Sequence, residues 1–241
     1  MMTLLAAAFF LPLFPFSMVL NGMLSRTKPA VLKACLLLVW PQIGVYLLHA
    51  GHAQPVSGYL MAWSLISSAC YALRLLTVRE LGLWAGLLAS SSLSLVWGAD
   101  DSMRPALAFW FSLSSAGLML LAGAFEKRLG AAYAGLYGAL PRYLPRLLGM
   151  LVMMVLAAVA TPPSPGFFAM LGILQRPSVT LIGLAIWLLW GWAAMILIQG
   201  FLSGHREPRP VQDVRHGHTL VFACFLVGSM AASFYLKGGV L

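Results

Sequence analysis

Residues 147–171 read LLGMLVMMVLAAVATPPSPGFFAML, an apolar stretch long enough to cross a lipid bilayer as a helix. Three prolines and a glycine lie well inside it, at Pro162, Pro163, Pro165 and Gly166. A proline removes a backbone donor and clashes with the preceding turn, so the sequence predicts a helix broken between Pro162 and Gly166. A broken helix in lipid is tolerated only where protein or a water-filled cavity covers the freed backbone.

Broken helices have two interpretations. They recur in ion-coupled transporters, because their exposed ends present helix dipoles to ions. The alternative is a proline kink at a helix end that has no function.

The composition of the whole chain is that of an integral membrane protein. Of 241 residues, 61% are hydrophobic and only 9% are charged, and the mean hydropathy is +0.90. An ordinary soluble domain has about 25% charged residues. The composition therefore excludes a soluble enzyme, a nucleic-acid-binding protein and a disordered tail. The net charge of +9 is explained by basic loops on the cytoplasmic side of a membrane.

The sequence predicts an all-α, polytopic fold that forms a single transmembrane domain over residues 1–241. The start of the chain has no basic segment and no small-residue cleavage site, so we expect a retained first helix rather than a signal peptide. Windows of about 20 apolar residues occur eight times, at 2–25, 31–50, 57–75, 81–99, 104–125, 147–171, 178–202 and 218–237.

Basic residues are shared unevenly between the loops that these spans define. Twelve lie in the four loops on one side, and three lie on the other side. Because basic loops stay in the cytoplasm, this bias predicts an even number of spans in the cell inner membrane, with both termini on the non-cytoplasmic side. The twelve are Arg26, Lys28, Lys33, Arg74, Arg79, Lys127, Arg128, Arg142, Arg146, Arg206, Arg209 and Arg215, and the three are Arg104, Arg176 and Lys237.

The predicted spans have no Lys, Asp or Glu near their middle. A proton relay across a membrane needs a chain of titratable groups or waters, and this chain is not expected to supply one alone. The candidates for a catalytic or metal site are Asp100, Asp101 and the polar stretch 205–218. We interpret both as solvated, and we expect no enzyme activity, metal or cofactor. Cys35, Cys70 and Cys224 lie in apolar runs and are interpreted as small core residues.

Neutral polar residues gather in two spans. Serines 90, 91, 92 and 94 lie in the fourth span, and serines 112, 114 and 115 lie in the fifth. Small residues allow close helix packing, and hydroxyls form hydrogen bonds across the contact. An alternative is a hydrated wall beside the ion path of a partner. Our candidates for partner contacts are Ser90, Ser94, Ser112, Ser115 and the charged run Glu126, Lys127 and Arg128.

The order of motifs within residues 81–202 resembles the second half of a known family. LAGAFEKR (121–128) ends a helix, LYGALPRYLPRL (136–147) follows as a loop, and ATPPSPGFFAML (160–171) forms the broken helix. This order is similar to that of the antiporter-like membrane subunits of respiratory complex I, Mrp-type sodium/proton antiporters, membrane hydrogenases and DAB-type inorganic-carbon transporters. The matching residues are Leu136, Tyr137, Gly138, Pro141, Arg142, Pro145, Pro162, Pro163, Pro165, Gly166 and Phe167.

This resemblance implies a fold and a place in a multi-subunit complex, but the chain departs from the family pattern. Family members have more helices, built around two inverted repeats, and this chain is expected to lack the first repeat. The histidine of the family's Ser-His pair is replaced by Leu113, which follows Ser112. The Lys or Glu that follows Gly-Phe in the family is replaced by Phe168, Ala169 and Met170.

The resulting prediction is a non-conducting accessory subunit of a proton- or cation-coupled complex. It is expected to pack against a larger, full-length antiporter-like subunit, other subunits of that complex and the lipid bilayer, with no nucleic acid. We favour a DAB-type inorganic-carbon uptake complex, followed by a complex I-like or Mrp-like complex. The alternative is a stand-alone small transporter or channel for a neutral or anionic solute.

Overall fold

The computed structural model describes residues 2–50, 57–138, 140–204 and 211–238 of the chain. Within these ranges the regular structure is helical. The helices are α1 (Met2–Phe10), α2 (Ser17–Arg26), α3 (Ala30–Ala50), α4 (Gly58–Leu75), α5 (Leu81–Leu95), the 3-10 turn η1 (Val96–Gly98), α6 (Arg104–Leu129), α7 (Leu140–Tyr143), α8 (Pro145–Ala158), α9 (Pro165–Leu174), α10 (Pro177–Leu202) and α11 (His216–Gly238).

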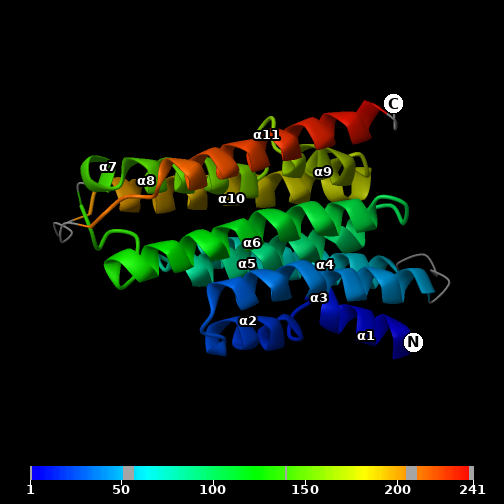
Figure 1. Cartoon of the computed structure of the whole chain (residues 1–241). Helices are drawn as coiled ribbons and strands as arrows, with labels where there is room; N and C mark the ends of the chain where they lie inside the picture. The colour runs from blue at the N-terminus through cyan, green and yellow to red at the C-terminus, as the bar shows by residue number, and fades with distance from the viewer. Residues whose placement is uncertain (1, 51–56, 139, 205–210, 239–241) are drawn as a thin grey trace.

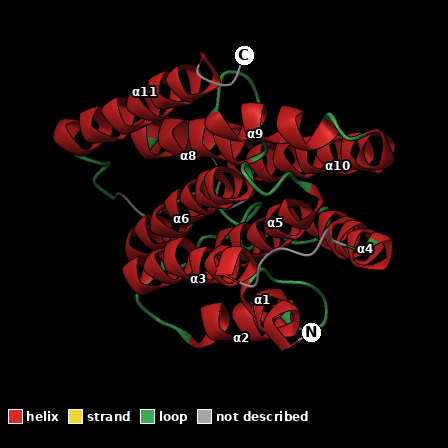
Figure 2. Ribbon diagram, turned by 90° about the vertical axis from the view of Figure 1, so that its right-hand side faces the viewer, coloured by secondary structure: helices red, strands yellow, loops and turns green. Residues whose placement is uncertain are grey.

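The helices form a layered bundle with α5 and α6 at its centre (Figure 1 and Figure 2). α1, α2 and α3 lie on one side of this centre, and α8 to α11 lie on the other side. α5 is almost completely buried, because α4 and α6 both pack along it. α11 is the outermost helix of its layer, and most of its described residues are exposed.

Five helices of the described chain are long and apolar enough to span a membrane, namely Ala30–Ala50, Leu81–Gly98, Arg104–Leu129, Pro177–Leu202 and His216–Phe234. A multi-pass membrane protein is therefore confirmed. The other predicted spans correspond to α4 and to two interrupted pairs, α1 with α2 and α8 with α9. The total of eight spans stays a prediction.

The loops gather at two ends of the bundle in the sets that the charge pattern predicts. At one end, the Leu81 N–H donates to the Ala132 carbonyl (2.9 Å), and the Gly135 N–H donates to the Gly200 carbonyl (2.8 Å). These bonds hold the basic α6–α7 loop against the start of α5 and the last turn of α10. α1 begins and α11 ends at the opposite end (Figure 1). The membrane side on which each end lies stays a prediction.

The predicted break in the sixth span is present. α8 ends at Ala158 and α9 begins at Pro165. Between them the backbone of Ala160 is left-handed, with φ 61°. The carbonyl of Val159, which a continuous helix would have bonded internally, accepts a hydrogen bond from Trp187 Nε1 of α10 (3.0 Å). Helix α10 therefore covers the freed backbone with a donor.

Another break, which lies earlier in the chain and is called the first break below, was not predicted. Residues 2–25 were expected to form one helix, but α1 ends at Phe10 and α2 begins at Ser17. The α8–α9 break is accordingly called the second break. Pro12 and Pro15 lie in the intervening segment, and each lacks a backbone donor. The hydropathy of the window concealed this break, because apolar residues flank both prolines.

Donors from four different elements satisfy the backbone of this first break. They come from α3, α4, α5 and η1, so helices of different layers bond to this segment. The bonds are Trp40 Nε1 to Phe9 O (3.3 Å), Trp63 Nε1 to Phe14 O (2.6 Å), Ser94 Oγ to Pro12 O (2.8 Å), Trp97 Nε1 to Leu11 O (3.3 Å) and Phe14 N to Ser67 Oγ (3.2 Å).

The three cysteines correct one expectation from the sequence. Cys35, Cys70 and Cys224 are exposed on the outside of the bundle rather than placed in its core. An apolar run in a membrane helix gives no period that separates the inner face from the lipid-facing side, so the sequence did not show which way these residues point.

The first break yields a testable prediction. Trp97→Phe removes the donor to the Leu11 carbonyl and keeps most of the side-chain volume, so we expect it to lower the free energy of unfolding by about 1–3 kcal/mol more than the control. The control is Trp84→Phe, because Trp84 is also fully buried but its Nε1 has no hydrogen-bond partner. Unfolding in detergent measures both variants. Equal losses would contradict the role assigned to Trp97.

The second break, between α8 and α9, yields another testable prediction. Replacing Pro162 and Pro163 with alanine restores two backbone donors, so we expect the α8–α9 helix to straighten, its contact with Trp187 to be lost and assembly to weaken. Pro177→Ala is the control, because Pro177 is an exposed residue at the first position of α10, where proline is tolerated. Helix content and recovery of intact protein in detergent are the measurements. A double variant that behaves like Pro177→Ala would show that these prolines do not maintain the break.

Candidate functional site

The polar interior of the bundle lies between the two broken helices. Ser90 and Ser94 of α5 are fully buried. Ser90 Oγ accepts a hydrogen bond from Asn21 Nδ2 of α2 and donates to the Gly86 carbonyl, both at 3.0 Å. Ser94 Oγ faces the carbonyls of Pro12 (2.8 Å) and Ser90 (2.7 Å). These two serines therefore fasten α5 to the first broken helix.

Ser91, on the same helix, joins three helices. Its Oγ donates to the Ser68 carbonyl of α4 (2.8 Å) and accepts from Trp190 Nε1 of α10 (2.9 Å). Ser68 returns a hydrogen bond to the Ser91 carbonyl (2.8 Å). Ser68 and Trp190 were not among the residues predicted from the sequence. A polar side chain in an apolar span is a visible signal in the sequence, but the neighbour to which it forms a hydrogen bond is decided by the packing of the helices.

The serines of α6 are also enclosed. Ser112 has no exposed surface and Ser115 is 1% exposed. Ser112 Oγ has no hydrogen-bond partner, a property shared by Ser164 Oγ in the second break. Together with Ser90 and Ser94, these α6 serines are turned toward the chain's own interior. The expectation that these serines contact a partner stays a prediction.

The charged run at the end of α6 has a different setting. Lys127 is exposed, whereas Glu126 and Arg128 are partly exposed. Arg128 Nη1 donates to the Ala124 carbonyl (3.2 Å), which is a favourable contact at the negative end of a helix. None of the three forms an ion pair with a described residue. This run is therefore available to a partner.

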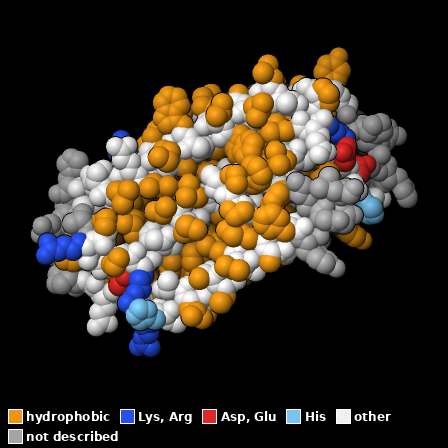
Figure 3. Space-filling model, turned by 90° about the horizontal axis from the view of Figure 1, so that it is seen from above, with side chains coloured by type: hydrophobic (Ala, Val, Ile, Leu, Met, Phe, Trp, Pro, Cys, Tyr) orange, Lys and Arg blue, Asp and Glu red, His pale blue; other side chains and the backbone are white. Residues whose placement is uncertain are grey.

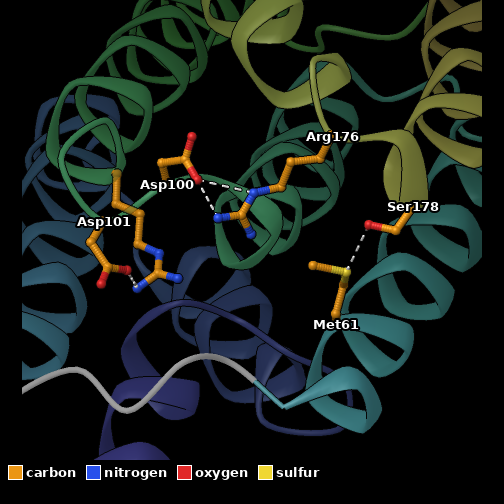
Figure 4. A network of polar contacts seen from close by, with 6 residues as sticks. Met61, Asp100, Asp101, Arg176 and Ser178 are labelled. Atoms are coloured by element: carbon orange, nitrogen blue, oxygen red, sulfur yellow. Dashed lines mark hydrogen bonds and ion pairs between the residues drawn. The ribbon is translucent and has the colours of Figure 1, made fainter.

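The acidic pair at the opposite end of the bundle is structural. Asp100 pairs with Arg176, and Asp101 pairs with Arg104 (Figure 4). Arg176 immediately precedes α10 and Arg104 begins α6, so the pairs tie the α5–α6 loop to both helices. The carboxylates are thus engaged by arginines.

The polar stretch 205–218 is described only in part. Residues 205–210, which include His205 and Glu207, lie outside the described residues. Asp213 accepts hydrogen bonds from the backbone N–H groups of Arg146 (2.9 Å) and Leu147 (3.2 Å), which lie in the first turn of α8. No group of three or more His, Cys, Asp or Glu within the described ranges is placed to hold a metal ion.

The interior of the bundle has little charge. Among described residues, the buried polar side chains are serines, with one charged exception at the end of the bundle. The exception is Arg104, which is paired with Asp101. Ser68, Ser91 and Ser94 donate to carbonyls of other elements, so they stabilise contacts between helices. The phenol of Tyr71 is also buried and pairs with Ser17. Among described residues, the interior therefore offers mainly hydroxyl groups.

Two serines provide a matched test of this interior. Ser91→Ala leaves the Trp190 N–H without an acceptor, and we expect a loss of about 1–3 kcal/mol in the free energy of unfolding. Ser112→Ala removes a hydroxyl that has no partner, so we expect little loss or a small gain. Thermal unfolding of both variants in the same detergent measures the difference. A larger loss for Ser112→Ala would contradict the assigned hydrogen bonds.

Solved structures of three membrane complexes contain chains with this fold. The first is respiratory complex I from Thermus thermophilus with bound NADH, with a TM-score of 0.79 and 20% identity over 98% of this chain and 55% of that chain. The second is the Mrp complex from Dietzia sp. DQ12-45-1b, with a TM-score of 0.74 and 14% identity over 85% of this chain and 42% of that chain. The third is the membrane-bound sulfane sulfur reductase, an archaeal respiratory membrane complex, with a TM-score of 0.77 and 15% identity over 98% of this chain and 52% of that chain.

Sequence comparison gives no further match, because no protein-family model and no curated protein matches the chain. The chain spans about half the length of the structural relatives. At these identities the likeness concerns the fold. The fold that the motifs of residues 81–202 imply is confirmed, and the chain has the fold of the antiporter-like membrane subunits.

Proposed function

We propose that the chain is a non-conducting accessory membrane subunit of a proton- or cation-coupled complex. The observation that carries this proposal is the chemistry of the described interior, where nearly all buried polar side chains are serines, several of which donate to backbone carbonyls. A proton path needs titratable groups or ordered waters in series. The described interior has hydroxyls where such a path needs acids and bases, and its buried arginine is already paired.

The positions at which the resemblance places proton-handling residues support this proposal. Ser112 stands in the Ser-His position of the family without the histidine, and it is fully buried. After Gly166 and Phe167, the buried Ala169 and Met170 occupy the place of the family's Lys or Glu. Neither a serine hydroxyl nor a methionine thioether exchanges protons readily near neutral pH.

A full-length antiporter-like subunit is the partner that we propose, because this chain covers only about half of such subunits. In this arrangement the partner supplies the ion path, and this chain has no catalytic activity or cofactor of its own. The cell inner membrane is the proposed location. The structural relatives come from respiratory and Mrp complexes, and they favour a complex of those classes. The DAB-type carbon-uptake complex rests on the sequence resemblance alone.

The charged run at the end of α6 is the polar contact that we propose for this partner. Lys127 is exposed and forms no ion pair with a described residue. It lies at the basic end of the bundle, where loops rather than lipid tails are expected to meet a neighbouring subunit. The apolar outer faces would supply the rest of the contact.

Purification of the tagged chain from its native membranes in mild detergent tests the proposal. We expect a full-length antiporter-like subunit to co-purify in fixed ratio, as identified by mass spectrometry. Lys127→Glu should lower its recovery, whereas Lys28→Glu makes the same charge change on an exposed loop for which we predict no partner contact. In the reconstituted complex, Ser112→Ala should leave ion transport unchanged.

Two outcomes would contradict the accessory role. One is a chain that purifies alone as a stable homo-oligomer and transports a solute in liposomes, which would establish the stand-alone transporter. The other is a clear loss of ion transport in the assembled Ser112→Ala complex, which would place this chain on the ion path.

A further inference from the structure

A groove runs between α8 and α11 on the outside of the bundle. Its cavity measures about 390 Å³, within the range of about 300–1,000 Å³ of small-molecule pockets. Met150 and Met153 of α8 and Phe222, Leu226 and Met230 of α11 line it. These side chains are apolar, and the methionines adapt readily to the shape of a flexible ligand.

The groove is open because two of the residues that line it have little or no side chain to fill the space. Gly149 of α8 and Ala223 of α11 both belong to its lining. A Cβ added at Gly149 would have no atom within 4 Å. α11 packs only lightly on the bundle, and most of its surface is exposed. The space beside Gly149 is therefore open to the membrane environment.

One end of the groove is basic. Arg146 lies in its lining, with Nη1 donating to the Val214 carbonyl (3.1 Å) and Nη2 lying 2.7 Å from His216 Nε2. The nearby Asp213 bonds to backbone N–H groups and forms no ion pair with a described arginine. The exposed Arg142 adds charge at the same end. Within the described part of the chain, the guanidinium of Arg146 is therefore held in place without an ion pair.

Both helices that form the groove begin at this basic end. α8 begins at Pro145 and α11 begins at His216. The Asp213 carboxylate already occupies the N-terminus of α8, so the positive dipole end of α11 is the one that adds to the basic side chains. Figure 3 shows a largely apolar face with basic and histidine side chains at both of its ends, one of which is the end where α7 lies in Figure 1. Thr219, one turn into α11, also lines the groove, and its buried Oγ1 has no partner.

We propose that this groove binds an anionic phospholipid. The phosphate would lie beside Arg146, and one acyl chain would lie along the methionines, Phe222 and Leu226. An apolar groove with an unneutralised cation at its mouth matches an anionic amphiphile, because each end of the ligand meets a surface of complementary chemistry. The charge bias of the loops predicts that this end is cytoplasmic, where anionic lipids attract basic residues. The site does not depend on the proposed accessory role.

Native mass spectrometry of the full chain, with any subunits that co-purify, tests the site. The purified protein is titrated with phosphatidylglycerol and with phosphatidylcholine of identical acyl chains. We expect phosphatidylglycerol to bind more tightly. Arg146→Gln should weaken its binding roughly fivefold, the effect of one basic group near an anionic headgroup, and should reduce the preference over phosphatidylcholine.

A second variant separates binding in the groove from a general effect on folding, since Arg146 also holds Val214. Ala223→Trp fills the groove and should weaken the binding of both lipids. Val221→Trp is its control, because Val221 is 68% exposed on the same helix and does not line the groove.

The proposal is overturned if the two lipids bind equally to the wild-type chain. It is also overturned if Ala223→Trp binds phosphatidylglycerol as tightly as Val221→Trp does. A complex that carries a protein helix in the groove and no lipid would likewise overturn it.

Discussion

The fold depends on one constraint, which is that backbone groups freed by proline inside an apolar environment must find hydrogen-bond partners. Two helices are interrupted by proline, and each interruption leaves carbonyls that water does not reach within a bilayer. Tryptophan indoles and serine hydroxyls of neighbouring helices supply the donors. Trp97 and Ser94 bond to the first interruption, and Trp187 bonds to the second. The positions of α3, α4, α5 and α10 around the interruptions follow from this requirement.

This constraint also explains why the interior is polar without being ionisable. A hydroxyl that donates to a carbonyl stabilises a helix contact, whereas an unpaired charge at the same depth would cost several kcal/mol. Ser91 and Ser94 act in this way on α5, and Ser90 accepts a hydrogen bond from Asn21 of α2. Because these hydroxyls are not ionisable near neutral pH, the described interior is compatible with the non-conducting role that we propose.

The features that depend on neighbouring residues in the sequence were predicted, whereas the direction of individual side chains, which depends on the packing of distant helices, was not. The second break was evident from three closely spaced prolines, and the sorting of loops followed from the distribution of arginine and lysine. The first break was missed, because Pro12 and Pro15 are farther apart in an otherwise apolar window. The inward direction of Ser112 and Ser115, and the outward direction of the cysteines, depend on neighbours that the sequence does not identify. The groove beside Gly149 was not predicted either, because it forms between α8 and α11, which are far apart in the sequence.

The donors that satisfy both breaks belong to this chain, and that fact limits where a partner can act. Trp187 and Trp97 already occupy the Val159 and Leu11 carbonyls, so another subunit is not needed to complete their hydrogen bonds. A partner must therefore attach through outer apolar faces and through charged loop ends such as Lys127. The same outer surface carries the groove at Arg146, so protein and lipid contacts would share the basic end of the bundle. Binding an anionic lipid there would offset positive charge that otherwise repels other basic loops.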